Sequence, residues 1–511
     1  MSQPASQDIP PVQTNDPKPP FILAIDVGTS STRTMLFDAT GATIPSVLAQ
    51  RPYQLTTSVK GEVSVDADAL VDIVGQTIND ALRSCGSMAR QIGAVAMDTF
   101  WHSLLGVDER NHAITPVITW EDTRAFNAAA DLLKQLNEEE VHKRTGARLH
   151  ASYWPAKLHW LATEEPETFQ RVTQWISFGE YLHRRFLGKS ICSLSMASAT
   201  GLFNTKARTW DKELMRVLDV RPEQLPQLGD VRDGITGLSS EYASAWPALR
   251  TIPWYPAIGD GAAAAVGSGC ANLDNWSLTI GTSSAIRVVL PPEKAVPSMS
   301  LWLYLIDDKR GIMGGALSEG GNVLNWLEAT LKLPPLRDTE TLIASMRPDE
   351  HGLTILPFIS GERSLGWHAQ SRMTISGVSV HTTPADLLRA SKESIAYQLR
   401  AVYDDLRSTL TVNGALPTPR MVASGGALLG SPTFQSILAD TLDTPIYPSR
   451  DHEASARGVA LLALESLGLI PDVAQVAPNL VAPVQPDHAR GEIYRAAMAR
   501  QAKLYHMLLP N

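Results

Sequence analysis

Cysteine is almost absent from this sequence, which has three in 511 residues, at Cys85, Cys192 and Cys270. They lie far apart and form no C-x-x-C pair. This spacing argues against both a disulfide framework and a structural zinc site. A chain with so few thiols is typical of a reducing compartment, so we expect a cytoplasmic protein.

Long apolar runs and blocks of one charge are also missing. No stretch approaches the roughly 18 uninterrupted apolar residues that a membrane span needs. The 44 basic and 53 acidic residues give a net charge of -9 without a Lys/Arg-rich block. Neither a membrane nor a nucleic acid is therefore an expected partner, and a small molecule is the better prediction.

The first twenty residues lack an apolar segment and include six prolines. They do not resemble a signal peptide, and we predict a disordered tail over 1–20 with folding from Phe21 onward. The rest of the chain exceeds what one hydrophobic core usually serves. Two or three domains are therefore expected.

One tetrapeptide, GTSS, occurs twice, at 28–31 and 281–284, each time between two apolar runs. The order of strand, small-residue turn and strand predicts a β-hairpin around each copy. Sliding the first hairpin by 253 residues superposes the two turns and brings Met35–Phe37 onto Val288–Leu290. A chain with the same hairpin in both halves looks duplicated.

Strand and helix patterns alternate through the rest of the chain, which predicts an α/β fold. The segment 123–146 predicts one helix closed by Gly146, and Ser431 is the expected N-cap of a later helix. Strands are expected at 92–100, 310–317, 352–361 and 420–426, and helices at 123–146, 320–332, 384–410, 431–442 and 451–464.

Turns rich in glycine and hydroxyl groups bring N–H and O–H donors close to a phosphate. Hairpin turns also contain Gly and Ser for conformational reasons alone, so one GTSS would be weak evidence. Two matched copies favour an ATP held between two domains by a donor loop from each. The acid Asp26 precedes only the first turn, Thr279 being its counterpart, and it suits Mg²⁺ bound through water.

Asp260 stands at the start of an Ala/Gly-rich helix in YPAIGDGAAAAVGSGC. Two interpretations stay open for it. Asp is a favoured N-cap, which would make the residue structural. A general base for a substrate hydroxyl would also have to lie here, at the junction just before the second hairpin.

Two further segments have both a functional and a structural interpretation. In the first, aromatic and polar groups suit a polyhydroxylated ligand, although core tryptophans and solvated charges explain them equally well. Its residues are Trp101, His102, Trp120, Glu121, Asp122 and Arg124. In the second, Gly425 and Gly426 end a strand beneath a helix N-terminus, which suits an adenosine or α-phosphate but also any tight turn.

Together these motifs resemble the FGGY family of carbohydrate kinases, of the sugar kinase, heat-shock and actin superfamily. The likeness runs from about Phe21 to about Leu464 through AIDVGTSSTR, TWEDTRA, ASATGLFN, the GDG of Asp260, TIGTSSAIR, GERSLGWHAQSR, ASGGALLGSPTFQSILAD and EASARGVALLA. It implies two ribonuclease-H-like, actin-like ATPase domains, 21–265 on the sugar side and 266–511 on the ATP side. ATP and sugar would occupy the cleft between them.

The resemblance also implies roles for individual residues. Asp260 would take the proton of the sugar hydroxyl, Asp26 would lie near Mg²⁺, and Trp101 and His102 would face the sugar. The contacts to ATP would come from Gly28, Thr29, Ser30, Arg33, Gly281, Thr282, Ser283, Gly425, Gly426 and Ala427. ATP and Mg²⁺ are thus the expected cofactors.

Within the family, the motifs look most like the gluconate kinase branch, which implies D-gluconate phosphorylated on its terminal hydroxyl. Departures from that branch at Trp101, His368 and 318–319 keep a ketopentose kinase for xylulose or ribulose open. A non-kinase actin-like ATPase with a protein partner is the third alternative. The expected partner is a small sugar or sugar acid, and a homodimer stays open.

A substrate carboxylate would need a cation or donors, since leaving it unpaired in a closed cleft costs on the order of several kcal/mol. The candidates are His102, Arg124 and Arg363. His102 and Arg124 lie near the expected sugar side, and Arg363 is a third candidate whose distance the sequence does not settle.

Overall fold

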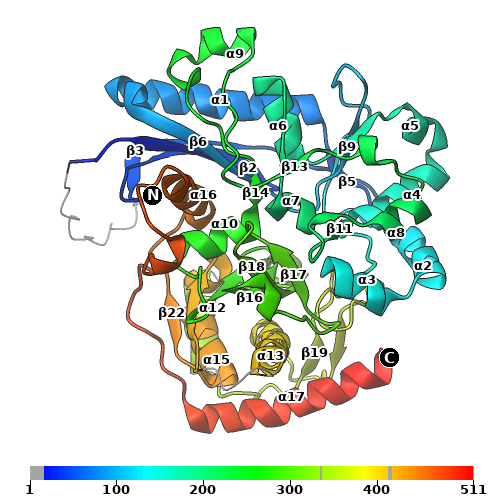
Figure 1. Ribbon diagram of the computed structural model, residues 1–511. Coiled ribbons are helices and arrows are strands. Elements are labelled where there is room, and N and C mark those ends of the chain that lie inside the picture. The colour runs from blue at the N-terminus through cyan, green and yellow to red at the C-terminus, as the bar shows by residue number, and fades with distance from the viewer. Residues whose placement is uncertain (1–15, 334–335, 412–416, 510–511) are drawn as a thin grey trace.

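The computed structural model describes residues 16–333, 336–411 and 417–509, and two mixed sheets form its two lobes (Figure 1). Residues 1–15 of the tail expected to be disordered lie outside the described residues. β1 begins at Phe21, but ordered structure begins before it, because the N–H of Lys18 donates to Asp38 Oδ2 at 3.3 Å and its carbonyl accepts from the N–H of Ala39 at 2.8 Å. The expectation of disorder up to residue 20 is therefore wrong at this end of the tail. Among the described residues, none of the helices combines the length and the hydrophobicity of a bilayer span. The three cysteines are free and buried, as expected.

The first sheet has the strand order β14-β6-β1-β2-β3. β1 (Phe21–Val27) and β2 (Ser31–Phe37) form the expected hairpin, which β3 (Thr43–Pro52) extends. β6 (Ile92–Thr99) and β14 (Ile258–Gly259) run parallel to β1. β1 is buried along its whole length, as its continuous apolar run predicts for a strand covered on both faces.

The second sheet has the order β17-β18-β16-β15-β21-β22. β15 (Asn275–Ile280) and β16 (Ser284–Leu290) form the second hairpin. β18 (Gly311–Leu317) and β17 (Trp302–Leu305) extend it on one side. On the other side β21 (Arg420–Ser424) and β22 (Ile446–Pro448) run parallel to β15.

The two sheets share one topology, in which a third antiparallel strand lies on one side of a hairpin and two parallel strands lie on the other side. The second sheet has β17 in addition. The duplication inferred from GTSS therefore extends over whole sheets. The pairing register differs by one residue, because Val27 pairs with Thr32 whereas its counterpart Ile280 pairs with Ser284. The offset of 253 residues therefore holds for the first strand of each hairpin but not for the second. The superposition of Met35 on Val288 is wrong by one position, and Met35 corresponds to the residue before Val288.

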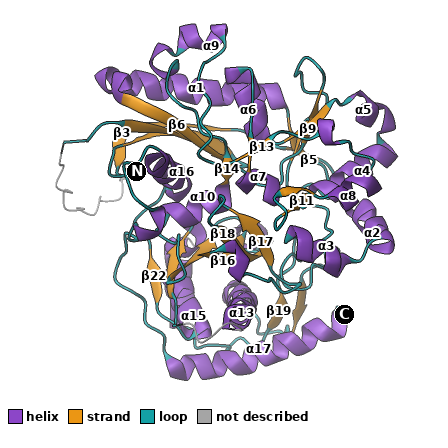
Figure 2. Cartoon of the chain, in the orientation of Figure 1, coloured by secondary structure: helices purple, strands orange, loops and turns teal. Residues whose placement is uncertain are grey.

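Helices cover the outer faces and fill the space between the sheets (Figure 2). α1 (Ala67–Cys85) packs on β2 and β3, and α13 (Pro384–Thr411) packs on β16 and β18. Between the sheets α10 (Asp260–Gly267) crosses α16 (Ala454–Ser466), which packs against β1 and β6 of the first sheet. The two helices touch closely, since a Cβ on Gly267 would lie 1.8 Å from the carbonyl oxygen of Ala454.

The remaining elements are short strands and helices that surround the two sheets. The further strands are β4 (Thr56–Thr57), β5 (Val63–Val65), β7 (Leu105–Val107), β8 (Val117–Ile118), β9 (Gln174–Ile176), β10 (Cys192–Ser193), β11 (Phe203–Asn204), β12 (Thr209–Trp210), β13 (Leu228–Gly229), β19 (Thr354–Leu356) and β20 (Thr374–Ser376). The further helices are α2 (Phe126–Gln135), α3 (Glu138–Thr145), α4 (Trp154–Glu164), α5 (Pro166–Arg171), α6 (Phe178–Leu187), α7 (Leu194–Ser198), α8 (Lys212–Val217), α9 (Ser240–Ala245), α11 (Gly321–Thr330), α12 (Leu336–Ser345), α14 (Gly426–Leu429), α15 (Pro432–Leu442) and α17 (His488–Leu508). Short 3₁₀ helices occur at Gly86–Gln91, Pro222–Gln224, Pro247–Leu249, Pro292–Lys294 and Val473–Gln475.

Two expected elements differ in the structure. The single helix predicted over 123–146 is two helices, because Asn137 is extended and its side chain accepts from the N–H of Glu140 as the N-cap of α3. Gly146 does end α3 in the left-handed region. The strand predicted over 352–361 is only Thr354–Leu356, and it stops before Pro357, which has no N–H to donate.

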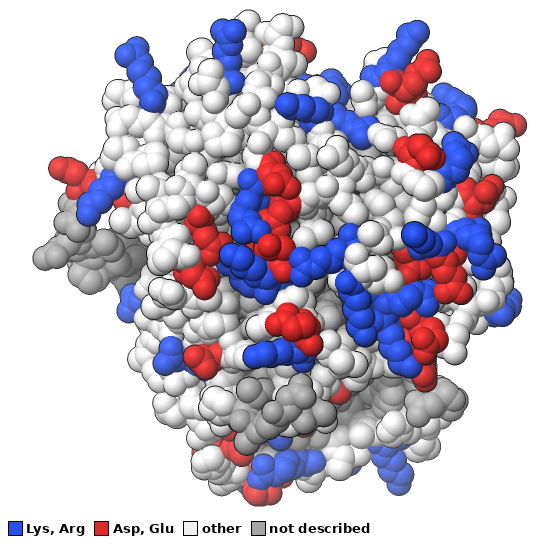
Figure 3. Space-filling model, in the orientation of Figure 1, with Lys and Arg blue, Asp and Glu red and all other residues white. Residues whose placement is uncertain are grey.

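Charged side chains of both signs are intermixed on the face drawn in Figure 3. Lys and Arg lie beside Asp and Glu across this face rather than in one extended patch. Such a surface agrees with the modest net charge of -9.

Candidate active site

The two GTSS turns face one cavity of about 250 Å³, here named the central cavity. Thr29 reaches it from the turn between β1 and β2. Thr282 and Ser283 reach it, with Gly281, from the turn between β15 and β16. Asp260 at the start of α10 lines the same space. The fold therefore brings a turn from each sheet and the candidate base together.

Tyr53 holds the first turn from outside the cavity. Its N–H donates to the carbonyl of Ser30 at 3.1 Å, and its hydroxyl donates to the carbonyl of Gly28. Gly28 and Ser30 are not among the described residues that line the central cavity, so they shape the turn that presents Thr29. Tyr53 was missed from the sequence, since it lies in an ordinary stretch beyond β3.

A second cavity of about 560 Å³, the Gly425 cavity, adjoins the central one, because Ala264, Thr279 and Ser455 line both. Gly425 has a φ of 92°, and a Cβ there would lie 2.3 Å from the carbonyl oxygen of Ile280. Only glycine fits this turn. The predicted residues around this cavity are Asp26, Arg33, Gly425 and Gly426.

Ala427 is placed differently from the two glycines that precede it. It is not one of the residues around the Gly425 cavity. A Cβ added to Gly321 of α11 would lie 3.1 Å from the Cβ of Ala427. The side chain of Ala427 thus packs toward α11, and only its backbone belongs to the glycine turn.

Asp26 and Arg33 face each other across the first hairpin. Arg33 Nη1 donates to Asp26 Oδ2 at 3.1 Å and lies 3.5 Å from Glu453 Oε2 at the start of α16. The guanidinium therefore joins the hairpin to the helix that packs between the sheets. Asp26 is nearly buried, and one of its oxygens is held by this pair.

Three carboxyl groups meet where parallel strands of the first sheet end. Asp98 in β6 is in register with Asp26 in β1, and Asp260 directly follows β14 on the other side of β6. Asp98 is fully buried, and neither of its oxygens has an N–H or O–H donor among the described residues. Burial, and then the charge of Asp26, raise its pKa well above the ordinary value.

This donor set fits a hard divalent cation such as Mg²⁺, which prefers carboxylate oxygens and water. Asp26 is the carboxylate that reaches the Gly425 cavity, and Asp98 lies beside it on the neighbouring strand β6. The second sheet has hydroxyl groups at the corresponding positions. There Thr279 and Ser424 are in register, and their hydroxyl oxygens lie 3.0 Å apart.

Asp260 is the first residue of α10 and not its N-cap, which is Gly259. Its Oδ1 accepts from the adjacent N–H of Gly261 at 2.8 Å. The N-cap interpretation is therefore wrong, and the carboxylate faces the central cavity. Burial raises the pKa of Asp260, while the charge of Arg287 and backbone N–H groups oppose that rise.

Arg287, in the middle of β16, lines the central cavity beside Asp260. A Cβ on Gly261 would lie 3.1 Å from its Nε. Its Nε and Nη1 are buried and have no hydrogen-bond partner in the described part of the chain. Burial lowers the pKa of Arg287 to about 10, against the opposing charge of Asp260. The group therefore stays cationic at neutral pH.

Trp101 packs beneath the backbone that carries Asp260. A Cβ on Gly259 would lie 1.7 Å from its indole Nε1, and one on Gly261 would lie 2.4 Å from its ring. The glycines of the GDG motif are thus required by this close approach. Trp101 is only 5% exposed, and its Nε1 donates to the carbonyl of Ser195 at 3.2 Å. It forms one wall of the central cavity.

His102 is buried next to Trp101 with a φ of 65°. Its Nδ1 lies 2.5 Å from the carbonyl of Ala199, so Nδ1 carries the proton and Nε2 is left as an acceptor. Burial and the charge of Arg363 lower the pKa of His102 well below its ordinary value. Behind it, Lys157 Nζ donates to the His102 carbonyl at 2.8 Å.

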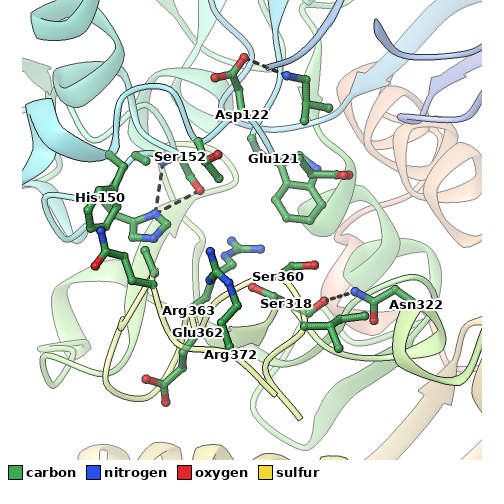
Figure 4. Close-up of a pocket in the computed structure, with 18 of the residues that line it drawn as sticks. Glu121, Asp122, His150, Ser152, Ser318, Asn322, Ser360, Glu362, Arg363 and Arg372 are labelled. Carbon is green, nitrogen blue, oxygen red and sulfur yellow. Dashed lines mark hydrogen bonds between the residues drawn. The ribbon is translucent and has the colours of Figure 1, made fainter. Parts of the chain in front are cut away.

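A third cavity of about 510 Å³, the Arg363 cavity, opens beside the central one, with which it shares Trp120, Glu121, Thr282 and Arg363. The guanidinium of Arg363 lies over the Trp120 ring, 5.0 Å from its centroid. Figure 4 shows Arg363 rising from the lower loop toward the space below Glu121, with His150 to one side. Its Nε is buried and finds no acceptor among the described residues.

The structure separates the three candidates for a substrate carboxylate. Arg124 is bound to Asp122 through Nε and Nη2, at 3.0 and 2.7 Å, and its guanidinium lies over Trp160. His102 is neutral and offers an acceptor at Nε2. Arg363 alone of the three is a cation with an unpartnered buried N–H, counted over the described residues.

Besides Tyr53, sequence reasoning missed Arg287 and Asp98. Arg287 interrupts the otherwise apolar strand SAIRVVL, and a lone charge in such a run is a signal that could have found it. Asp98 ends the strand IGAVAMDT at the same level as Asp26, but only the strand order makes them neighbours.

Comparisons with known proteins identify the family of this chain. The model of the N-terminal domain of the FGGY family of carbohydrate kinases matches residues 21–267, and that of the C-terminal domain matches 276–467. A gluconokinase of Bacillus subtilis (strain 168) is 26% identical over 96% of this chain and 94% of that protein. The solved gluconate kinase of Lactobacillus acidophilus has a TM-score of 0.86 at 26% identity, over 96% of this chain and 98% of that one. A ligand-bound xylulose kinase of the same organism has a TM-score of 0.86 at 25% identity, over 96% and 99%.

Proposed function

This chain belongs to the FGGY family of carbohydrate kinases, with the two-domain, actin-like α/β fold of solved sugar kinases, and we propose that its acceptor is D-gluconate. The terminal hydroxyl would receive the γ-phosphoryl group of ATP, and the product would be 6-phosphogluconate. The observation that carries the choice of a sugar acid is the buried Nε of Arg363, which has no hydrogen-bond partner among the described residues and lies in a cavity continuous with that of Asp260.

Asp260 is the proposed general base. Its carboxylate faces the central cavity, oriented by the N–H of Gly261, so an acceptor hydroxyl there would lie within reach. Proton transfer to a positioned carboxylate as the new O–P bond forms is the usual role of such a group in phosphoryl transfer. The charge of Arg287 opposes the rise in the pKa of this carboxylate that burial causes.

The phosphates of ATP would lie between the two GTSS turns, Gly28–Ser30 and Gly281–Ser283. Thr29 faces the central cavity from the first turn, and Gly281, Thr282 and Ser283 face it from the second. Adenosine would extend into the Gly425 cavity past Gly425, Gly426 and the backbone of Ala427. Arg33 would remain with Asp26 and Glu453 at its edge. Bound Mg²⁺ neutralises charge on the transferring phosphates, and Asp26 would hold it through water.

The acceptor would extend from Asp260 into the Arg363 cavity. His102 Nε2 and the Glu121 carboxylate would accept from its hydroxyl groups, and Trp101 would limit its width. A carboxylate at the far end would find a partner in Arg363. Leaving a carboxylate unpaired in such a cleft costs on the order of several kcal/mol, so this pairing would discriminate in favour of an acid.

A ketopentose such as xylulose is the second candidate acceptor. One observation favours it: Trp101 fills the space beneath Asp260, which narrows the inner end of the acceptor site and suits a shorter carbon chain. A non-kinase ATPase that serves a protein partner would instead turn over ATP without any polyol.

ADP release from a panel of aldonates, ketoses and polyols tests the proposal. We expect turnover to depend on the added acceptor and kcat/KM to be highest for gluconate. A kcat/KM for xylulose or ribulose at least about tenfold above that for gluconate, roughly 1.4 kcal/mol in transition-state binding, would overturn the gluconate assignment. ATP turnover that ignores every acceptor would favour the ATPase alternative.

A further inference from the structure

Two arginines with unpartnered buried N–H groups project into the cavities of the candidate active site from the second half of the chain. Arg287 comes from β16, and Arg363 comes from the loop between β19 and β20. A buried N–H group without an acceptor is costly unless a ligand supplies one. The two groups also repel each other, which is one of the effects that lower the pKa of Arg287. Such an arrangement fits a ligand with negative charge at two places.

The two guanidinium groups serve different parts of the site. Arg287 belongs to the central cavity, where its Nε lies against Gly261, next to Asp260. Arg363 lies over Trp120 and also lines the outer cavity with His150 and Glu121. One positive charge is therefore at the reacting end, and the other is toward the far end of the acceptor.

The first hairpin indicates that β16 does not need an arginine to fold. Arg287 pairs with Ser277, and the residue at the same register of the first hairpin is Met35, which pairs with Ala24. Met35 is 3% exposed and packs in the core. An apolar side chain of similar length is thus compatible with this hairpin, so the charge at Arg287 calls for a functional explanation.

We propose that Arg287 is a catalytic residue that donates hydrogen bonds to the γ-phosphoryl oxygens during transfer, whereas Arg363 binds the far end of the acceptor. The inference rests on the proposed role of Asp260, because it places the reacting hydroxyl between Asp260 and the GTSS turns. Nε and Nη1 of Arg287 lie at that end and have no acceptor among the residues that the structure describes.

The step balances as follows. The acceptor oxygen attacks the γ-phosphorus, its proton passes to Asp260, and the bond from the γ-phosphorus to the bridging oxygen breaks, so that ADP leaves with the bonding pair. The three non-bridging oxygens carry the charge that an arginine stabilises best in the transition state. Arg287 approaches from the second half and Asp260 from the first. Both would therefore act only when the lobes enclose the acceptor.

Steady-state kinetics of Arg287→Met, Arg287→Lys and Arg363→Met test the assignment on the full chain. Met at 287 reproduces the residue of the first hairpin, and Arg171→Met on the exposed end of α5 controls for the substitution itself. We expect Arg287→Met to lower kcat at least about 10²-fold for every acceptor, acid or neutral, with KM for ATP within about threefold. Arg363→Met should raise KM for acids and affect neutral polyols little.

Calorimetry with a non-hydrolysable ATP analogue and a thermal melt establish that each variant is folded. If Arg287→Met fails to fold, Arg287→Lys takes its place, because a lysine keeps the charge but loses the fork geometry and should still lose kcat. A kcat near that of the wild type, or a loss confined to carboxylated acceptors, would overturn the role of Arg287.

The outcome is separable from that of the proposed function. If the panel identifies an acceptor other than gluconate, kcat of the Arg287 variants is measured with that acceptor, and the test of Arg287 is unchanged. If Asp260→Asn retains kcat while Arg287→Met loses it, the proposed base fails and the arginine does not.

Discussion

Replacing Asp260 by Asn tests the proposed base with little change in shape. Oδ1 of the amide can still accept from the N–H of Gly261, which Asp260 now does at 2.8 Å. The variant cannot take a proton from the acceptor hydroxyl. A positioned general base contributes about 10²- to 10⁴-fold, so we expect kcat to fall by that factor, equivalent to about 3 to 5 kcal/mol in the barrier.

The binding of ATP should survive the Asp260→Asn change. The two GTSS turns and the Gly425 cavity keep their donors, and the net loss of one negative charge in the cleft favours an anionic nucleotide. A coupled assay of ADP release gives kcat, and calorimetry with a non-hydrolysable analogue gives Kd. We expect Kd to stay within about threefold of the wild type while kcat falls.

Asp66→Asn is the matched control. Asp66 is a true N-cap, whose side chain accepts from the N–H of Ala69 at 2.8 Å at the start of α1. Asn and Asp cap helices about equally well, so this variant should keep both activity and stability. If Asp260→Asn matched Asp66→Asn, with kcat within a few-fold of the wild type, the reasoning from the cavity geometry would be refuted.

Four other perturbations address the rest of the site. Asp26→Ala should lower activity steeply and flatten its dependence on Mg²⁺, with a melting temperature near that of the wild type, because the change removes a charge beside buried Asp98. If Asp26→Ala instead had a lowered melting temperature but full specific activity at low temperature, the role of Asp26 would be structural. Thr279→Asp puts a carboxylate between the central and Gly425 cavities, where its partner across the hairpin is Ala285 rather than an arginine. The binding of an ATP analogue should therefore weaken about tenfold, while Thr279→Asn should bind it normally. Equal Kd values for the two variants would contradict this. Acceptor and ATP analogue together should close the lobes and reduce the radius of gyration in X-ray scattering, and an unchanged radius counts against closure. Burial lowers the pKa of Lys157 from 10.5 to about 7, so the folded state binds fewer protons than the unfolded state between those values, and the free energy of unfolding should rise from pH 7 to 10 relative to Lys157→Met. A parallel pH dependence of both proteins in urea titrations would exclude that pKa.

The sequence predicted those parts of the site that local patterns encode. Each hairpin is a continuous stretch whose apolar strands and small turn identify it, and both lie where they were predicted. The one-residue difference in register was not predictable, because the geometry of the turn decides which residues pair across it. Nor could the sequence separate a helix cap from a base at Asp260, since both favour an acid at a helix start.

The arginines show what tertiary structure adds. The sequence does not show that the guanidinium of Arg124 is bound by Asp122. It also does not show that Nε of Arg363 has no hydrogen-bond partner among the described residues. Both facts depend on which loops meet over the cavity. The sequence placed His102 and Arg124 near the expected sugar side and left the distance of Arg363 open, whereas in the structure Arg363 is the one of the three with an unpartnered buried N–H among the described residues.

A duplicated fold becomes a directional transfer site because its two copies diverge at matched positions. At the ends of β1 and β6 the first copy has the acids Asp26 and Asp98, whereas the second has the hydroxyls of Thr279 and Ser424. The second copy has Arg287 at the register where the first has apolar Met35. The acids at these matched positions thus come from the first copy, and Arg287, which lines the central cavity, comes from the second. A symmetric pair of acids would repel the phosphates from both sides, whereas this asymmetry would let one half hold the proposed cation and base while the other half stabilises the phosphoryl group.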